Sequence, residues 1–548
     1  IDSRIEFNPT VALEYVDHVR GMAVEIDRQY DYLIVGAGSS GAVLAARLSE
    51  NPKTTVLLIE SGLDYRSHEA PVAMHSANPL GITNPDNYPD HQWPLLMARR
   101  SSAQEPRRYD RGRGLGGSST INYMIAHRAM LEDYDSWAEQ GCVGWSGEEL
   151  LPAMNRLEND LDYGDAPYHG NRGPVTIYRP TFAQWGKVDL ALLEAGLELG
   201  YPWCSDLNAP ISTGISAMPV NRTDVGRVST NDAYLEPARD RPNLTILGNT
   251  HVDRVLFDGR QAIGVIASRS GSTAEFYARE IIISAGAAFS PAILLRSGIG
   301  PAADLLGLGI PVLNNLPVGN NLLDHSAVGL KLDLRPEMRA TEWDTRLMCC
   351  YIRYSSGIAG ASTNDMVISS RNLGSFDEAG LPFGGINVLT WQNFSRGILR
   401  LASRDPLELP EIDQQLLSDE RDLVRLRDGA RRLFAIARQR SVRVVAERVT
   451  LVNYSADSPF VTMDDVNDDR ALDEWLLSAV RDTWHISGTC RMGNADDPRT
   501  VVDSDCNVLG TTNLRVIDGS IMPEVTRANT NLTCMTIAEH MARRLQTR

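Results

Sequence analysis

A glycine-rich turn between a buried strand and a helix constrains this chain more than any other feature. Gly36, Gly38 and Gly41 follow the pattern G-x-G-x-x-G, after the apolar run 32–35 and before the helix-forming run 42–49. In such a turn the first glycine permits the sharp bend, and the second lets the backbone approach a pyrophosphate. The third allows the helix to pack closely on the strand, and the N-terminus of that helix favours phosphate charge. The pattern predicts a dinucleotide site in a βαβ unit.

The second strand of this unit supports the same prediction. Residues 55–59 form another apolar run, which ends at Glu60. A carboxylate at this place accepts hydrogen bonds from ribose hydroxyls and repels a 2′-phosphate, which disfavours NADP. Ser39 and Ser40 lie inside the turn itself. A purely structural glycine turn is the alternative, and the fingerprint alone does not separate NAD from FAD.

A second glycine-rich turn favours the larger cofactor. Residues 112–119 include Gly116 and Gly117 and precede a helix that we expect to begin near Thr120. An NAD-dependent dehydrogenase needs one phosphate cradle, whereas a second cradle suits a cofactor that stays bound along its whole length. A plain surface loop is the alternative for this segment.

Further patterns divide the chain into two interleaved parts. Residues 330–334 alternate between apolar and charged side chains, as a half-buried strand of an antiparallel sheet does. We expect an α/β chain, α+β overall, in which a Rossmann-like nucleotide domain is interleaved with a substrate domain built on an antiparallel sheet with helices. The expected strands are 244–256, 262–267, 281–283, 330–334, 386–389 and 514–517, and the expected helices are 9–22, 416–445 and 531–545.

Composition excludes several classes of function. The net charge of −17 would repel nucleic acid phosphates; it serves solubility or, as an alternative, a cationic substrate. The seven cysteines are odd in number and irregularly spaced, so we expect neither a disulfide framework nor a metal site. No run of 18 apolar residues predicts a membrane span, and the first 30 residues lack a signal-peptide pattern. We therefore expect a cytoplasmic location.

Several long motifs resemble one family of flavoproteins. The stretch 112–122 resembles the first signature of the glucose–methanol–choline (GMC) oxidoreductases, and 284–301 resembles the second. The segments 228–235, 241–244 and 514–523 also match text of that family. The motifs occur in the family's order, and the resemblance runs from about residue 30 to the end of the chain.

The resemblance implies bound FAD and a discontinuous FAD-binding domain. Ile121 stands where some members carry a histidine joined covalently to the flavin, so we expect non-covalent FAD. The implied FAD-binding domain comprises 30–170, 228–325 and 482–548, the substrate domain 171–227 and 326–481, and an N-terminal arm 1–29. The residues expected to hold the cofactor are Gly36, Gly38, Ser39, Ser40, Gly41, Glu60, Arg113, Gly116, Gly117, Asn122, Val252, Ala285, Asp518, Gly519, Thr530 and Asn531.

A histidine and an asparagine form the expected catalytic pair. Oxidation of an alcohol needs a base for the hydroxyl proton while hydride leaves for flavin N5, and a histidine has a suitable pKa. His485 lies in a segment that resembles the one with the family's catalytic histidine, and Asn529 occupies the second catalytic position. Asn529 can donate to the substrate oxygen but cannot act as a base. Alone, it could equally be a helix N-cap.

The C-terminal motifs look closest to the bacterial 5-(hydroxymethyl)furfural oxidase-like branch of the family. That branch oxidises primary alcohols on aromatic or heteroaromatic rings to aldehydes, and in some cases onward to acids, with O₂ or another acceptor. Tyr123 and Trp391 are candidates for contact with a ring or, equally, for core positions. Choline-oxidase-like and aryl-alcohol members are close alternatives. Further rivals are a hydroxynitrile lyase that keeps FAD without redox chemistry, and a flavin-binding protein without catalysis.

Overall fold

The computed structural model describes residues 29–84, 86–358, 360–453 and 467–547. The helix expected at 9–22 and nearly all of the N-terminal arm lie outside this part of the chain. Within these ranges, no helix combines the length and the apolar character that crossing a bilayer requires.

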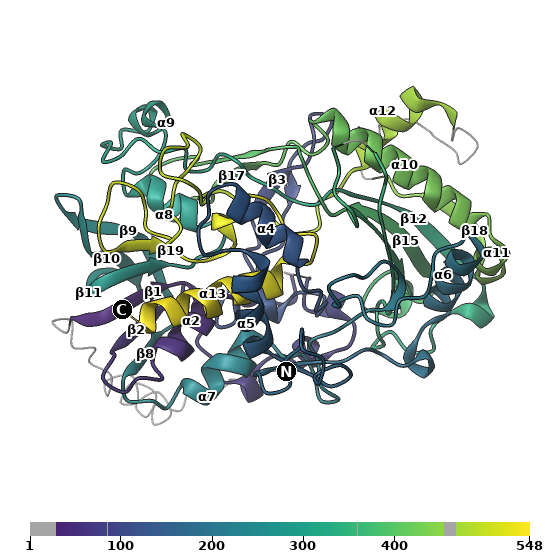
Figure 1. The fold of residues 1–548 in the computed structure, drawn as a ribbon, viewed down its shortest axis with the longest axis horizontal. Coiled ribbons are helices and arrows are strands. Elements are labelled where there is room, and N and C mark those ends of the chain that lie inside the picture. The colour runs from purple at the N-terminus through teal and green to yellow at the C-terminus, as the bar shows by residue number, and fades with distance from the viewer. Residues whose placement is uncertain (1–28, 85, 359, 454–466, 548) are drawn as a thin grey trace, which may run out of the picture.

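A parallel sheet forms the core of one half of the molecule (Figure 1). Its strands follow the order β8-β2-β1-β11-β19, and every neighbouring pair among them is parallel. Their apolar runs are buried because helices and loops cover both faces, as parallel sheets require. The bounds are β1 (Tyr30–Val35), β2 (Val56–Ile59), β8 (Leu244–Leu247), β11 (Ser272–Ile283) and β19 (Leu514–Val516).

The strand expected at 244–256 is wrong as a single element. Asn249 has a φ of 50°, and this left-handed residue separates β8 from β9 (Thr250–Asp258). β8 pairs with β2, whereas β9 pairs antiparallel with β10 (Gln261–Arg269). β10 in turn pairs antiparallel with the first half of β11. One apolar run therefore supplies strands at both edges of this sheet.

Three helices pack together beside the parallel sheet. α13 (Thr530–Gln546) contacts both α2 (Gly41–Leu48) and α5 (Gly147–Leu157). Figure 1 shows α13, in yellow, running next to α2 over the purple strands of the chain start. The C-terminal helix thus packs against the first βαβ unit.

The helix expected from Thr120 is absent from the structure. Residues Gly117–Thr120 form one 3₁₀ turn, and the next helix, α4, begins only at Leu131 (Leu131–Glu139). Two features end the turn. Met124 adopts a φ of 58°, and the side-chain oxygen of Asn122 accepts the Met124 N–H at 2.9 Å. This side chain competes with the helical hydrogen bond, as asparagine commonly does.

An antiparallel sheet forms the other half, as expected. Its order is β18-β12-β15-β14-β13-β7, with every neighbouring pair antiparallel. Leu330, Leu332 and Leu334 are buried in one core, whereas Lys331 and Asp333 are partly exposed. The bounds are β7 (Gly214–Ala217), β12 (Ala327–Leu334), β13 (Cys350–Tyr354), β14 (Met366–Arg371), β15 (Phe383–Thr390) and β18 (Ala446–Leu451).

Helices cover the apolar face of this second sheet. The helical region expected at 416–445 is two helices, and the longer one packs on β15 and β12. The helices are α6 (Lys187–Glu198), α10 (Glu420–Ala437), α11 (Arg440–Val445) and α12 (Asp469–Ala479). The expected fold class is confirmed, while the residue boundaries between the two parts stay a prediction.

Short strands and helices complete the fold outside the two main sheets. A four-stranded sheet of order β16-β17-β3-β4 and a two-stranded sheet, β5-β6, lie outside the main sheets. The strands are β3 (Met97–Arg99), β4 (Arg107–Arg108), β5 (Glu158–Asp160), β6 (Val175–Ile177), β16 (Ile398–Arg400) and β17 (Glu411–Asp413), and the remaining helices are α3 (Val72–His75), α7 (Glu236–Ala238), α8 (Ser290–Arg296) and α9 (Ala302–Gly307).

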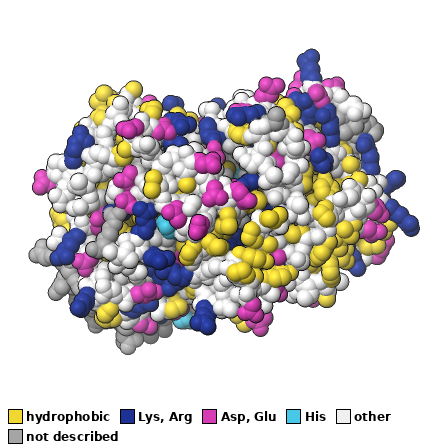
Figure 2. Space-filling model, viewed as in Figure 1, with side chains coloured by type: hydrophobic (Ala, Val, Ile, Leu, Met, Phe, Trp, Pro, Cys, Tyr) yellow, Lys and Arg dark blue, Asp and Glu magenta, His cyan; other side chains and the backbone are white. Residues whose placement is uncertain are grey.

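The two halves differ in surface chemistry on the face seen in Figure 2. Hydrophobic side chains gather at the lower right, over the half that carries the antiparallel sheet. Acidic and basic side chains are interspersed over the other half. The net negative charge is therefore not concentrated in a single patch of this face.

Substituting Phe434 tests how strongly α10 stabilises the second sheet. Phe434 is fully buried, and its ring centroid lies 6.3 Å from that of Trp475 in α12. We expect Phe434→Ala to lower the free energy of unfolding by about 3–5 kcal/mol, because it leaves a cavity in the core. Urea unfolding followed by tryptophan fluorescence measures this. Val444→Ala, at a 46% exposed position of α11, is the control and should change stability by less than about 0.5 kcal/mol.

Candidate active site

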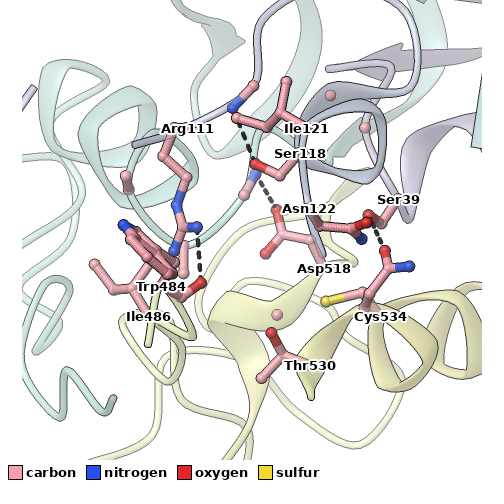
Figure 3. A pocket seen from close by; sticks show the side chains of 18 of the residues that line it. Ser39, Arg111, Ser118, Ile121, Asn122, Trp484, Ile486, Asp518, Thr530 and Cys534 are labelled. Atoms are coloured by element: carbon pink, nitrogen blue, oxygen red, sulfur yellow. Dashed lines mark hydrogen bonds between the residues drawn. The ribbon is translucent and has the colours of Figure 1, made fainter. Parts of the chain in front are cut away.

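One long cavity connects the two halves of the molecule. It begins at the two glycine-rich turns, passes His485 and Asn529, and ends against the antiparallel sheet at Leu389 of β15. Figure 3 shows part of its wall, with Arg111 and Trp484 on one side and Ser39 and Cys534 on the other. The cavity lies at the carboxyl ends of the parallel strands, where open α/β sheets bind their ligands.

The first glycine turn leaves space where a pyrophosphate would approach. A Cβ added to Gly41 would lie 1.8 Å from the Gly36 carbonyl oxygen, so Gly41 is needed for packing. A Cβ on Gly38 would have only the Gly117 Cα nearby, at 3.9 Å, and Gly38 lines the cavity. The turn thus leaves space on the cavity side at Gly38, whereas at Gly41 the helix packs directly against the turn.

Glu60 connects both turns and keeps an acceptor site for a ligand. Its Oε1 accepts the N–H groups of Gly62 and Gly114 at 2.8 and 3.0 Å, and its Oε2 accepts that of Ala37 at 2.9 Å. A carboxylate offers about four acceptor sites. One therefore remains on Oε2, and Glu60 lines the cavity where a ribose hydroxyl would use it.

The C-terminal helix closes this end of the cavity. Ser39 Oγ donates to Asn531 Oδ1 at 2.7 Å, and Ser40 Oγ donates to the Cys534 carbonyl at 2.9 Å. The Nδ2 of Asn531 is buried without a partner among the described residues. A bound cofactor with acceptor oxygens would satisfy this donor. Asp518 also lines the cavity, with its carboxylate accepting the Gly286 N–H at 2.8 Å.

A buried arginine orients Asn122 in the second turn. Arg227 Nη1 donates to the Asn122 side-chain oxygen at 2.7 Å, and burial lowers the pKa of Arg227 to about 9. Ile121 lines the cavity beside Asn122, as Figure 3 shows, so a hydrocarbon side chain occupies the position that some GMC members use for covalent attachment.

The structure brings most of the expected cofactor residues to the cavity. Gly41, Arg113 and Gly116 do not line it. Gly116 donates its N–H to the Ala37 carbonyl, and the Arg113 guanidinium lies over Trp93, so these residues support the turns. Those that line the cavity are Gly36, Gly38, Ser39, Ser40, Glu60, Gly117, Asn122, Val252, Ala285, Asp518, Gly519, Thr530 and Asn531.

His485 and Asn529 face each other at the middle of the cavity. The Nε2 of His485 lies 3.2 Å from the Nδ2 of Asn529, and both side chains line the cavity. Asn529 precedes the first residue of α13, yet its side chain caps no backbone N–H. The alternative role of Asn529 as a side-chain N-cap is therefore not seen. Its amide donates to His485 instead.

A second histidine fixes the protonation pattern of the first. His325 Nε2 lies 3.1 Å from the Thr526 carbonyl, which can only accept, so Nε2 carries the hydrogen. The Nδ1 of neutral His325 then has a lone pair, and it lies 2.8 Å from His485 Nδ1, which must donate to it. His485 Nδ1 also lies 2.8 Å from Thr483 Oγ1. The lone pair of neutral His485 is therefore on Nε2, directed at Asn529 and the cavity.

One buried carboxylate holds the backbone of both histidines. Asp324 Oδ1 accepts the N–H groups of His325 and His485 at 2.8 and 3.0 Å. Its Oδ2 accepts from the Tyr109 hydroxyl at 2.7 Å and from Gln414 Nε2 at 2.9 Å. Burial, reinforced by the charge of Asp482, raises the pKa of Asp324 to about 7.

Burial keeps both histidines neutral. Burial lowers the pKa of His325 to about 4. Burial, together with the neighbouring His325 and Arg111, holds the pKa of His485 well below its ordinary value. A neutral His485 at physiological pH keeps the unprotonated Nε2 that a general base needs.

Trp484 adopts a strained backbone conformation at the site. Its φ of 61° is uncommon for a bulky residue and costs of order 1–3 kcal/mol. Arg111 Nη1 donates to the Trp484 carbonyl at 2.8 Å, an interaction drawn in Figure 3. This conformation places Thr483, Trp484 and His485 in succession on the cavity wall.

Sequence reasoning missed His325, Thr483 and Arg111. His325 is 160 residues from its partner His485, so no local spacing signals the contact. Tyr123 lines the cavity as a ring contact would, whereas Trp391 is fully buried outside the lining and serves as a core residue.

A separate buried cluster contains side chains of the kinds that ligate metals. Glu158, Asp160 and His169 lie close together, with Glu158 Oε1 at 2.7 Å from His169 Nδ1. Arg128 pairs with Glu158 at 2.9 Å, and Arg179 pairs with Asp160 at 2.6 Å. Each carboxylate already has a cationic partner, so the cluster is explained as an ion-pair network.

Comparison with known proteins identifies the family. Two family models described as GMC oxidoreductase match residues 30–327 and 393–538. The chain belongs to the GMC oxidoreductases. It is 38% identical over 532 residues to 5-(hydroxymethyl)furfural oxidase of Methylovorus sp. (strain MP688), covering 94% of this chain and 98% of that protein.

More distant relatives agree. Oxygen-dependent choline dehydrogenase 1 of Chromohalobacter salexigens is 34% identical, with 95% of each chain covered. The crystal structure of pyridoxine 4-oxidase from Mesorbium loti superimposes with a TM-score of 0.84 at 28% identity, covering 95% of this chain and all of that one. This GMC oxidoreductase is an FAD-dependent enzyme that oxidises the CH–OH group of small-molecule alcohols, with O₂ or another acceptor. Nothing in these relatives favours the lyase alternative.

Gly38 tests the cofactor end of the site. We expect Gly38→Ala to weaken FAD binding by about 10- to 100-fold, because its methyl group would occupy the space left for the pyrophosphate, a crowding worth about 1–3 kcal/mol. The 450 nm absorbance per protein after dialysis measures this, and the melting temperature of the apoprotein should not change. Gly307→Ala, at an exposed glycine with no atom within 4 Å of its added Cβ, is the matched control. Full flavin content in Gly38→Ala would contradict the assignment.

Proposed function

We propose that this GMC oxidoreductase oxidises a primary alcohol carried by an aromatic or heteroaromatic ring to the aldehyde, with His485 as the base and Asn529 as the donor to the substrate oxygen. The observation that carries the proposal is the geometry of this pair. The unprotonated Nε2 of His485 and the Asn529 amide lie 3.2 Å apart in the cavity, so a substrate hydroxyl placed between them would meet the base and the donor together.

The proton of the alcohol moves to the Nε2 lone pair of His485, in exchange for the hydrogen bond from Asn529. As Nε2 takes this proton, the developing alkoxide is stabilised by the Asn529 amide. The resulting imidazolium keeps its Nδ1–H on the lone pair of His325. That hydrogen bond strengthens as charge develops, because one of its partners becomes ionised.

FAD supplies, when bound, the oxidant that accepts hydride from the alcohol carbon. Gly38, Glu60, Asp518 and Asn531 are proposed to hold it, since they line the cavity next to the open turn, the free acceptor and the unpartnered donor. We propose that it is bound non-covalently, which the hydrocarbon side chain of Ile121 supports.

Two aromatic side chains support a ring-bearing substrate. The rings of Tyr123 and Trp484 lie 5.6 Å apart on the cavity wall, between the glycine turns and the antiparallel sheet. The relative from Methylovorus, named for its action on 5-(hydroxymethyl)furfural, supports the same class. O₂ is the proposed acceptor. A cytoplasmic location is proposed because all seven cysteines are free thiols.

Removing the base gives a direct test. Benzyl alcohols and furfuryl alcohols are mixed anaerobically with the holoenzyme, and the bleaching of the flavin band is followed. We expect His485→Ala to slow flavin reduction by about 10²–10⁴-fold, the usual contribution of a general base. Asn529→Ala should slow flavin reduction by a smaller factor, and this variant should still bind FAD. Reduction of His485→Ala at the wild-type rate would exclude the base, and re-oxidation in air separates an oxidase from a dehydrogenase.

The pH dependence of flavin reduction tests the same group. Burial lowers the pKa of His485, so the base is already neutral at pH 7. We expect a rate constant that is level from about pH 7 to 9 and falls only well below the ordinary pKa of histidine, as His485 becomes protonated. Stopped-flow measurements at constant ionic strength provide the profile. A rate that rises through an apparent pKa above 7 would contradict this arrangement.

A further inference from the structure

The end of the cavity farthest from the glycine turns is a row of polar side chains on the antiparallel sheet. Tyr351 of β13 lies opposite Ser369 of β14, and Ser369 lies opposite Asn387 of β15. Residues directly opposite each other across antiparallel strands project from the same face. All three line the cavity.

The polar groups of these side chains have no hydrogen-bond partner among the described residues, although the Tyr351 ring packs against His127 and Trp391. No hydrogen bond joins the side chain of Tyr351, Ser369 or Asn387 to another residue in the part of the chain that the structure describes. Gly329 of β12, next in the row, gives room for the amide, since a Cβ there would lie 2.3 Å from the Asn387 side-chain oxygen. The row therefore offers a hydroxyl, a phenol and an amide to whatever occupies the cavity.

Arg481 extends this face with a positive charge. Its backbone exchanges two hydrogen bonds with Ala327, at 2.8 and 2.9 Å, and Ala327 lies two residues before Gly329 on the same strand and face. Arg481 lines the cavity. Burial raises the pKa of Tyr351, and the positive charge of Arg481 opposes that rise, so the guanidinium acts on the Tyr351 hydroxyl.

Arg481 has no carboxylate partner among the described residues. Its one side-chain hydrogen bond is long, 3.5 Å to the Asp482 carbonyl. The Asp482 carboxylate itself pairs with Arg100 at 2.6 Å. Of the acidic residues on the cavity wall, Asp110 pairs with Arg108, and Asp518 accepts from the Gly286 N–H and the Ser290 hydroxyl. Glu60 lies in the turns at the other end.

Arg481 is partly buried and faces the cavity without a counterion among the described residues, so it can pair with an anionic group of a ligand. Arginine binds a carboxylate through two parallel hydrogen bonds, and nearby hydroxyl and amide donors add to such a site. The same charge would repel a quaternary ammonium group.

We propose that the alcohol oxidised by this enzyme carries a carboxylate group at the end remote from its hydroxymethyl carbon, and that Arg481, with Ser369 and Asn387, binds that carboxylate. This inference rests on the proposed function, because the hydroxymethyl end is assigned to His485 and Asn529. Under this proposal Arg481 determines substrate specificity, and it distinguishes this chain from enzymes that oxidise cationic alcohols.

A matched pair of substrates tests the charge. The holoenzyme is assayed with 4-(hydroxymethyl)benzoate and with 4-methylbenzyl alcohol, which differ at the remote group. We expect the wild type to favour the carboxylate in kcat/KM, and Arg481→Gln to lower the ratio of the two values by about 10- to 100-fold, the range for a hydrogen bond to a charged group. Arg470→Gln, at a 90% exposed arginine, is the matched control and should keep the ratio.

Charge reversal and a binding probe sharpen the test. Arg481→Glu should change the preference toward 4-(aminomethyl)benzyl alcohol. The non-reacting 4-methylbenzoate should perturb the flavin spectrum of the wild type, with a Kd that rises about 10- to 100-fold in Arg481→Gln.

The outcomes separate the two proposals. A flavin that neutral alcohols reduce, with a substrate ratio that Arg481→Gln leaves unchanged, would overturn the carboxylate site alone. A flavin that no alcohol reduces, while 4-methylbenzoate still binds through Arg481, would overturn the proposed oxidation and leave the anion site. A wild type that prefers the cationic alcohol would also overturn this inference.

Discussion

The carboxylate of Asp324 determines where both active-site histidines lie. Its two oxygens accept hydrogen bonds from the backbone N–H groups of His325 and His485, from the Tyr109 hydroxyl and from Gln414, and a longer one from the Thr483 N–H. Four acceptor sites is about what a carboxylate offers, and filling them offsets the cost of burying it. On either side of this contact, paired backbone hydrogen bonds join Leu323 to Ser487 and Ala327 to Arg481. The histidine pair thus depends on a short junction between two distant segments, and the catalytic geometry follows from the backbone.

The sequence predicts those parts of the site that depend on neighbouring residues. The turn at Gly36, its flanking strands and Glu60 carry their own local signal, because glycine spacing and apolar runs act over a few residues. The helix expected from Thr120 failed because the Asn122 side chain and the left-handed Met124 override the helical pattern. His325 gave no signal at all, since only the tertiary fold brings it to His485. Helices, strands and motifs are local, whereas the proton network is not.

The cavity is built on different principles at its two ends. At the cofactor end, Gly38 leaves the backbone open to the cavity. The groups that this end offers to a ligand come from the backbone and from the start of α13. The opposite end is made of side chains projecting from three adjacent strands. Because strand side chains can change without moving the backbone, that end can vary in chemistry while the turns stay the same. Relatives named for a furan alcohol, choline and pyridoxine fit this division.

The hydrogen bond between Ser39 and Asn531 joins residues that are 492 positions apart. Ribosomes deliver a chain from its N-terminus, so the first glycine turn emerges long before the helix that completes it. A nascent or truncated chain without α13 would lack the partners of both Ser39 and Ser40. The two serines of the first glycine turn therefore gain these contacts only once α13 has been synthesised, so this end of the cavity is completed late in the synthesis of the chain.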